Sequence, residues 1–183
     1  MARLPYLEKS DLPEAVQDVL NRDINLYKIL AHSPNAARAF QGLGRFIRYE
    51  SKLDPRLREM AILMVGYLAR SPYEYSHHIK IGRDFGVSDD DIRGLIEEAE
   101  GRPSTLDPTS KLVLRAAREM TEDGSVSDAT FASLENEMSR EHLLDLIITI
   151  GFYNAVVRVL ASTGMDVEES YMSYLDEFPL PKD

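Results

Sequence analysis

The sequence predicts an all-α fold in a single domain. Apolar residues recur at helical spacing through almost the whole chain. No alternating apolar and polar stretches are joined by the turn residues of a β-hairpin. A length of 183 residues suits one domain with its own core. We therefore expect one helical domain over residues 1–183, with N-terminal helices in 1–50, a motif-bearing core in 53–122 and C-terminal helices in 123–183.

Capping residues and prolines divide the chain into predicted helices. Asp54-Pro55 and Ser71-Pro72 are each typical of a helix start. The polar side chain suits the cap position, and proline suits the first turn. Asp11 is expected to cap the first helix. The predicted helices cover about residues 12–21, 24–31, 34–49, 55–70, 72–86, 89–98, 108–121, 128–138, 140–162 and 167–176.

The helix predicted over 140–162 is apolar on nearly every side. Asp145 and Thr149 lie on one side of it, and Asn154 and Arg158 lie roughly opposite. These polar interruptions indicate a buried core helix, not a membrane span. Such a helix is either central to the core or shared with another subunit, and we expect a homo-oligomer.

The composition excludes several classes of protein. The net charge of −10 argues against nucleic acid as a partner, because phosphate binding needs clustered Lys and Arg. The chain has no cysteine, which excludes disulfides, thiolate catalysis and Cys-ligated metal. The N-terminus lacks the apolar stretch of a signal peptide. We expect a cytoplasmic protein whose partners are a small-molecule substrate and its own copies, with neither nucleic acid nor membrane.

Three ionisable residues on two predicted helices are the strongest functional candidates. On the helix opened by Ser71-Pro72, Glu74 and His78 are i,i+4 neighbours aligned with core-facing residues. Glu59 lies on the preceding helix, which is apolar on nearly every side. Burial raises a carboxyl pKa and lowers a histidine pKa, toward values useful for proton transfer. We expect Glu59, Glu74 and His78 to meet in an apolar cleft as acid–base residues.

A purely structural interpretation of the same residues stays open. Ser71 and Glu74 have the spacing of a capping box. Glu59 could pair with Arg56, and His78 could be a buried core histidine. The chain would then be a non-catalytic oligomeric binding protein. A polar cavity at the three acid–base candidates favours an enzyme, whereas a filled interior favours a scaffold or binding protein.

Other motifs add little. His77 and His78 point about 100° apart on a helix, so both cannot easily bind one ion, and no HExxH pattern is present. Phosphate-binding glycine loops and a G-x-S-x-G elbow are absent from the sequence. We therefore expect neither a metal nor an organic cofactor. Gly42 and Gly44, inside a helical stretch, indicate close helix packing.

The spacing Glu59-x11-Ser71-x2-Glu74-x3-His78 resembles the signature of the carboxymuconolactone decarboxylase and alkylhydroperoxidase-D-like superfamily. Redox members carry cysteine at the positions of Ser71 and Glu74. Five stretches of the chain are similar to the family: 25–34, 53–63, 73–78, 123–128 and 151–158. The resemblance implies an orthogonal helical bundle that assembles as a dimer, trimer or hexamer. With both cysteines missing, peroxide reduction through a disulfide is not expected.

The family's namesake decarboxylates a small carboxylated lactone. The resemblance implies a cysteine-independent acid–base enzyme, either a decarboxylase or other lyase or an isomerase, acting on a small organic acid or lactone. His78 would donate the proton. Glu74 would orient the His78 side chain or set its charge. Glu59 would be a second acid–base group or a gate to the site. Asn154 or Arg158 would bind a carboxylate. The remaining substrate-binding candidates are Ser71, Tyr75 and His77.

Overall fold

The computed structural model describes residues 2–181, so Met1, Lys182 and Asp183 of the predicted domain lie outside it. The described residues form helices and no strand, which confirms the all-α class. The α-helices are α1 (Asn25–Leu30), α2 (Pro34–Arg45), α3 (Pro55–Leu68), α4 (Pro72–Asp84), α5 (Asp89–Ala99), α6 (Pro108–Glu122), α7 (Asp128–Glu137), α8 (Arg140–Thr163) and α9 (Glu169–Glu177). Short 3-10 helices cover Lys9–Asp11 and Glu14–Leu20, and a π-helical turn, Phe46–Glu50, continues α2.

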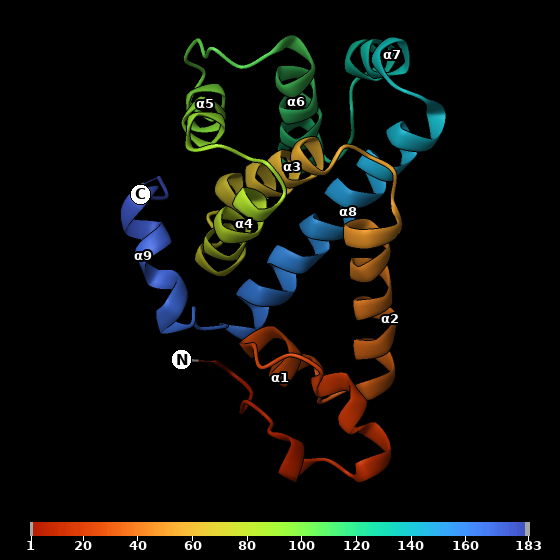
Figure 1. The fold of residues 1–183 in the computed structure, drawn as a ribbon, viewed down its shortest axis with the longest axis vertical. Helices are drawn as coiled ribbons and strands as arrows, with labels where there is room; N and C mark the ends of the chain where they lie inside the picture. The colour runs from red at the N-terminus through yellow and green to blue at the C-terminus, as the bar shows by residue number, and fades with distance from the viewer. Residues whose placement is uncertain (1, 182–183) are drawn as a thin grey trace.

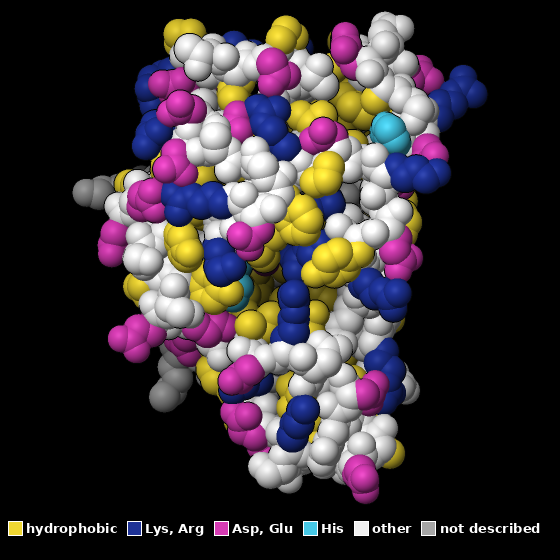
Figure 2. Space-filling view, viewed as in Figure 1, with side chains coloured by type: hydrophobic (Ala, Val, Ile, Leu, Met, Phe, Trp, Pro, Cys, Tyr) yellow, Lys and Arg dark blue, Asp and Glu magenta, His cyan; other side chains and the backbone are white. Residues whose placement is uncertain are grey.

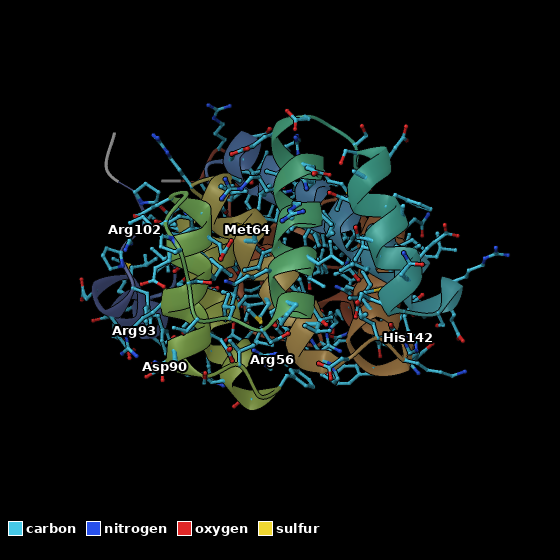
Figure 3. All side chains as sticks on the ribbon, turned by 90° about the horizontal axis from the view of Figure 1, so that it is seen from above. Arg56, Met64, Asp90, Arg93, Arg102 and His142 are labelled. Atoms are coloured by element: carbon cyan, nitrogen blue, oxygen red, sulfur yellow. The ribbon has the colours of Figure 1, made fainter. Side chains whose placement is uncertain are left out.

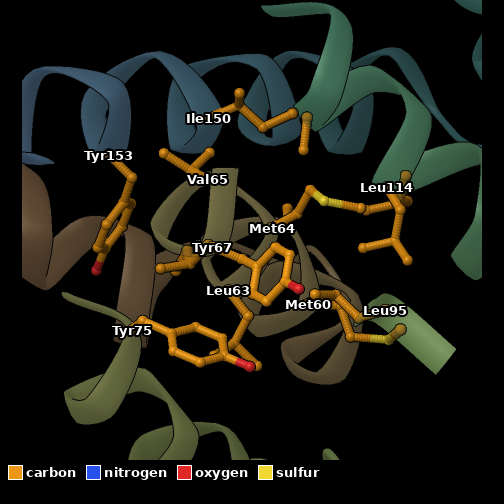
Figure 4. Packing of buried hydrophobic residues seen from close by; sticks show 14 of the residues in the cluster. Met60, Leu63, Met64, Val65, Tyr67, Tyr75, Leu95, Leu114, Ile150 and Tyr153 are labelled. Carbon is orange, nitrogen blue, oxygen red and sulfur yellow. The ribbon is translucent and has the colours of Figure 1, made fainter. Parts of the chain in front are cut away.

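Helix α3 lies at the centre of the bundle (Figure 1). Helices α4, α5, α6 and α8 all pack against it, and α9 packs along α4. Every residue from Arg58 to Tyr67 is buried, because apolar side chains surround the whole helix after its first turn. The core residues labelled in Figure 4, including Leu63, Met64 and Ile150, join α3 to its neighbours.

Helix α8 is long and apolar enough to span a membrane by length and composition alone, with a mean hydropathy of 1.8. However, 56% of its most apolar 18-residue stretch is buried inside the protein. It crosses the molecule diagonally and packs against both α3 and α6 (Figure 1). Its packing agrees with the core position expected from its apolar surface.

The first predicted helix differs from expectation. Residues 14–20 form a 3-10 helix, with bonds such as Val16 N–H to the Pro13 carbonyl at 3.0 Å. Asp11 does not cap it, because its carboxylate accepts instead from the backbone N–H of Glu8 at 2.8 Å. The cap predicted at Asp54 forms, and its carboxylate accepts from the backbone N–H of Leu57 at 3.0 Å.

Close helix packing occurs at Gly66, where α3 meets α4. A Cβ on Gly66 would lie 3.2 Å from the backbone nitrogen of Tyr75. The expectation for Gly42 is wrong, because nothing lies within 4 Å of where its Cβ would be. Gly44 has one ordinary contact, 3.8 Å from the Phe152 ring. The glycine that brings α3 and α4 together also brings together the helices that carry Glu59 and His78.

Candidate active site

The structure brings together the three predicted acid–base side chains. His78 Nδ1 lies 2.6 Å from Glu59 Oε2, and His78 Nε2 lies 2.9 Å from Glu74 Oε1. Helix α3 supplies Glu59, and α4 supplies the other two. Each side chain is at most 5% exposed. We call Glu59, His78 and Glu74 the carboxylate–histidine relay.

The capping interpretation of Glu74 does not hold. Ser71 occupies the cap position of α4, but its hydroxyl makes no cap hydrogen bond. Glu74 turns toward His78 and forms no capping box with Ser71. Arg56 does not pair with Glu59, because its guanidinium is engaged by carboxylates at the starts of α5 and α6. Both acids are therefore committed to the relay.

Arg58 balances the charge of Glu59 at the buried end of the relay. Its Nε and Nη2 donate to Glu59 Oε1 at 3.0 and 2.9 Å. Its Nη1 donates to the backbone carbonyls of Ile47 and Arg48 at 3.4 and 3.1 Å. With an exposure of only 2%, Arg58 joins the relay to the π-helical turn through buried contacts.

The two carboxylates of the relay favour the protonated form of His78. Burial disfavours the imidazolium, but the charges of Glu59 and Glu74 outweigh burial and raise the pKa of His78. Burial also disfavours the Glu59 carboxylate, but His78 and then Arg58 outweigh it and lower the pKa of Glu59. Burial alone would lower the pKa of His78 and raise the pKa of Glu59. Both shifts have the opposite sign, because each group is buried next to a group of opposite charge.

A cleft of about 900 Å³ opens beside the relay. Glu74 and His78 line it, whereas Glu59 lies behind the His78 ring and is fully buried. The cleft walls come from α1 and the segment before it, α2, the π-helical turn, α4, α8 and Tyr171 of α9. Figure 2 shows this hollow, with hydrophobic side chains on its floor and basic side chains over its mouth. A small molecule in the cleft would reach the Glu74 side of the relay.

Among the five predicted substrate-binding residues, only His77 lines the cleft. Ser71 lies at the start of α4, away from the cleft lining. Tyr75 is fully buried in the core, where its ring packs edge-on against Tyr67 at 5.5 Å (Figure 4). Tyr75 follows Glu74 directly and is rotated about 100° around the helix, so it faces the core while Glu74 faces the cleft.

Asn154 and Arg158 also lie away from the cleft. The Asn154 amide donates to Thr121 Oγ1 of α6 at 3.1 Å. Arg158 Nη1 donates to Asn154 Oδ1 at 2.9 Å, and its side chain is otherwise exposed. Tyr153, which directly precedes Asn154 on α8, lines the cleft instead. The expected carboxylate-binding residues are therefore on the wrong side of α8.

Sequence reasoning missed two cleft residues, Tyr153 and Arg48. The Tyr153 ring contacts His78 edge-on, with ring centres 5.0 Å apart. Burial, then Glu74 and Glu59, raise the pKa of Tyr153, so its phenol stays neutral. Arg48 lines the same cleft from the π-helical turn. Tyr153 lies within a stretch that resembles the family, but no local pattern relates Arg48 to the relay.

His77 has a separate environment at the edge of the cleft. Its ring is stacked between Tyr73 and Tyr171, with centres 4.1 and 3.6 Å away. Its Nε2 lies 2.8 Å from Glu168 Oε2. Glu168 also accepts from the backbone N–H of Asn25 at 2.7 Å. His77 thus connects α4 to α9 through Tyr171 and, through Glu168, to the start of α1. It is not part of the relay.

The relay has the geometry of proton sharing. Its two carboxylates approach opposite nitrogens of a single imidazole ring. Across residues 2–181, no three His, Asp or Glu side chains are arranged to hold a metal ion. The expectation that the protein needs no metal or organic cofactor stays a prediction.

Comparison with known proteins relates about half of the chain to a family. Residues 34–119 match the model of the carboxymuconolactone decarboxylase family. No curated protein matches the sequence. Several solved structures are similar in fold, among them the following three. One is a peroxidase-related protein from Ralstonia eutropha JMP134, described as an alkylhydroperoxidase AhpD core, with a TM-score of 0.74, 20% identity and 95% of both chains covered.

The second is the debrominase Bmp8, solved as a cysteine-to-alanine variant with 2,3,4-tribromopyrrole. Its TM-score is 0.77, its identity is 22%, and 93% of this chain and 94% of that chain are covered. The third, from Agrobacterium tumefaciens, is a protein of unknown function described as a possible AhpD antioxidant defence protein. It has a TM-score of 0.67 and 21% identity, with 76% of this chain and 95% of that chain covered. Residues 34–119 thus match the carboxymuconolactone decarboxylase family, and the chain shares the alkylhydroperoxidase-D-like orthogonal helical bundle but has no cysteine.

Proposed function

We propose that the chain is a cysteine-independent acid–base enzyme that decarboxylates, cleaves or isomerises a small organic acid or lactone. The observation that carries this proposal is His78, held between Glu59 and Glu74 at the wall of an open cleft. A protonated imidazole between two carboxylates can store a proton and exchange it with a bound molecule.

The positions of the two carboxylates support different roles for them. Glu59 contacts His78 Nδ1 from the buried side of the ring and does not line the cleft. It therefore orients the His78 ring and stabilises its charge. Glu74 contacts Nε2 and lines the cleft, so it shares the proton at the side where substrate binds. The sequence suggested the orienting role for Glu74, but its place in the cleft favours exchange instead.

In a decarboxylation, the bond between the substrate carbon and its carboxylate breaks and CO₂ leaves. The electron pair stays on the substrate as a dienolate. The relay proton then forms the new C–H bond. A water molecule returns a proton to the relay, and the hydroxide left combines with the CO₂ as bicarbonate. An isomerisation uses the same groups to remove a proton from one carbon and deliver one to another. Neither reaction needs a thiol, and this chain has none.

The structural neighbours support a small ring compound as the substrate. Bmp8 was solved with 2,3,4-tribromopyrrole in a variant that has lost a cysteine. This chain has no cysteine at all, so thiol-dependent peroxide reduction does not carry over from the peroxidase-related neighbours. A lyase or isomerase reaction fits both the fold and the residues that are present.

The test is a screen of carboxylated lactones and small ring acids in D₂O, followed by NMR. Decarboxylation or deuterium incorporation at carbon identifies a substrate. On that substrate, His78→Gln is expected to reduce turnover about 100-fold or more, because the general acid is lost. The matched control is His142→Gln, at the start of α8 and outside the cleft (Figure 3).

Unchanged turnover in His78→Gln would reject the assignment. Tight binding without turnover across the whole screen would instead favour a non-catalytic binding protein on the same fold. Equal losses in the two histidine variants would show that the effect is not specific to the relay.

A further inference from the structure

We infer that Arg48 forms an anion-binding subsite in the cleft, which selects small ring compounds that carry a single negative charge. This subsite names the substrate class of the proposed function and rests on it for the reaction.

Arg48 differs from most of the other cations that line the cleft. Three of these are already paired with carboxylates: Arg38 with Asp18 at 2.7 Å, Arg45 with Glu50 at 3.1 Å and Lys80 with Asp84 at 3.2 Å. The guanidinium of Arg48 interacts with the phenols of Tyr49 and Tyr153. Among the described residues, no salt bridge joins Arg48 to a carboxylate, and buried Glu59, whose salt bridges are to Arg58 and His78, attracts its charge from farther away. Its positive charge is therefore available to a ligand.

The formal charges of the site favour a monoanion. Arg58 and His78 contribute two positive charges, and Glu59 and Glu74 contribute two negative charges, so this buried group sums to zero. Arg48 adds one positive charge beside it. One carboxylate on a ligand would neutralise this excess, whereas a dianion would leave an unbalanced charge in a site of low dielectric.

The backbone that carries Arg48 is tied to the relay. Arg58 donates to the carbonyls of Ile47 and Arg48, and the π-helical turn closes with a bond from Ser51 N–H to the Phe46 carbonyl at 2.9 Å. Turns of this kind are frequent at functional sites. The same buried arginine therefore positions both the Arg48 backbone and the Glu59 carboxylate.

Aromatic rings form the wall of the cleft beside the relay. Phe40 and Phe152 have ring centres 4.8 Å apart, Phe152 and Tyr153 5.5 Å, and Tyr153 and His78 5.0 Å. This wall suits the face of a flat or cyclic apolar body. The neutral Tyr153 hydroxyl and the planar Arg48 guanidinium can both donate to a carboxylate, and arginine does so with two parallel bonds.

The test compares benzoate with its neutral analogue benzamide, as probes of charge on the same ring. Calorimetry at pH 7 and low ionic strength measures both affinities. The wild-type chain is expected to bind benzoate about tenfold or more tighter than benzamide. Arg48→Gln should weaken benzoate about tenfold or more and leave benzamide unchanged, and Arg48→Lys should fall between because it keeps only a point charge.

The matched control is Arg22→Gln, which removes the same charge at the exposed rim of the cleft. We expect it to change benzoate affinity by no more than about twofold, because rim charges are screened. Equal affinities of the wild type for the two probes would overturn the inference, even if Arg48→Gln fails to fold. Equal losses in Arg22→Gln and Arg48→Gln would overturn it too, by showing a general field effect.

The binding readout separates this inference from the proposed function. If Arg48→Gln loses its affinity for benzoate while His78→Gln keeps full turnover, the anion-binding subsite is supported and the proposed reaction is rejected. If His78→Gln abolishes turnover while Arg48→Gln binds benzoate as tightly as the wild type, the reaction stands and the subsite fails.

Discussion

Glu59 is the residue on which the charge of the relay depends most. It is fully buried, and its two oxygens are taken by Arg58 and His78. Burying such charges costs free energy that their attraction only partly returns, so a buried ion pair is weak evidence for stability. This supports a functional reason for keeping an ionised carboxylate behind His78.

Replacing Glu59 by Gln should destabilise the fold in a pH-dependent way. At pH 7 we expect a loss of about 3–5 kcal/mol in the free energy of unfolding, because the charge of Arg58 is left buried without a carboxylate to balance it. The pKa of Glu59 is lower in the folded chain than in the unfolded one. Its contribution is therefore complete above about pH 4.3 and is lost as the pH falls through the folded pKa.

Urea unfolding of the wild type and of Glu59→Gln between pH 3 and pH 7 would measure this difference. The difference in the free energy of unfolding between the wild type and Glu59→Gln should become smaller as the pH falls toward 3. A gap that is independent of pH would contradict the assignment of an ionised Glu59.

Tyr75 offers a stability test that does not involve the relay. Its hydroxyl is buried without a hydrogen-bond partner in the described structure. Tyr75→Phe removes this unpaired group and should raise the free energy of unfolding by about 1 kcal/mol. The matched change Tyr67→Phe removes a bond to Glu100 at 3.3 Å and should lower it by up to about 1 kcal/mol. Denaturant unfolding that ranks the two variants the other way would contradict this account of the core.

At the scale of elements, the relay depends on how closely α3 and α4 approach each other. Gly66→Ala would place a methyl group 3.2 Å from a backbone atom of Tyr75, and α4 would have to shift. We expect a loss of about 1–3 kcal/mol from overpacking. Thermal unfolding would measure it.

The control for this substitution is Gly42→Ala, on α2, where the added methyl group meets nothing within 4 Å. Alanine favours a helix over glycine, so Gly42→Ala should be neutral or stabilise by up to about 1 kcal/mol. Similar losses of stability in Gly66→Ala and Gly42→Ala would mean that α3 and α4 are not closely packed at Gly66.

Local spacing explains which parts of the site could be predicted. Glu74 and His78 are one helical turn apart, so the sequence places them on one face. Ser71 and Glu74 have capping spacing as well, and only the fold shows that His78 is the partner of Glu74. Arg48 reaches the cleft through the path of the chain after α2, which no periodicity records.

Helix α8 shows the same limit. It is apolar nearly all round, so the sequence does not say which side faces the relay. The polar Asn154 and Arg158 drew attention to one side, but Tyr153 is the residue that contacts His78. The helices themselves were largely predictable, because caps and prolines are local signals. The exception is residues 14–20, where Asp11 bonds backward along the chain.

At the scale of the whole molecule, Glu168 ties the two ends of the chain to α4. It accepts from the backbone of Asn25, from the Tyr73 hydroxyl at 3.1 Å and from His77. Figure 1 shows α9 beside α4, with α1 close to the end of α8. This one carboxylate therefore organises the N-terminal and C-terminal edges of the cleft.

Replacing Glu168 by Ala should loosen both edges without unfolding the core. Hydrogen exchange of α1 and α9 should become faster, because their links to α4 are lost, while α3 stays protected. Glu169→Ala, at an exposed neighbouring position, is the control and should change neither helix. Faster exchange throughout α3 would contradict a local role for Glu168.

Self-association as a dimer, trimer or hexamer remains a prediction. Leu144 on α8 is 56% exposed, and Gly151, Ala155 and Ala161 of the same helix are exposed as well. A second copy that covers this face would explain why α8 is apolar on sides that the bundle leaves open.

The central claim is that Glu59 and Glu74 keep a proton on buried His78. The most direct measurement is an NMR titration of the imidazole nitrogens, with the His78 signal assigned from His78→Gln. We predict that His78 titrates above the ordinary value of about 6.5, and that Glu74→Gln lowers its pKa because one of the two carboxylates is lost. A His78 pKa below about 6.5 in the wild type, unchanged in Glu74→Gln, would contradict the account.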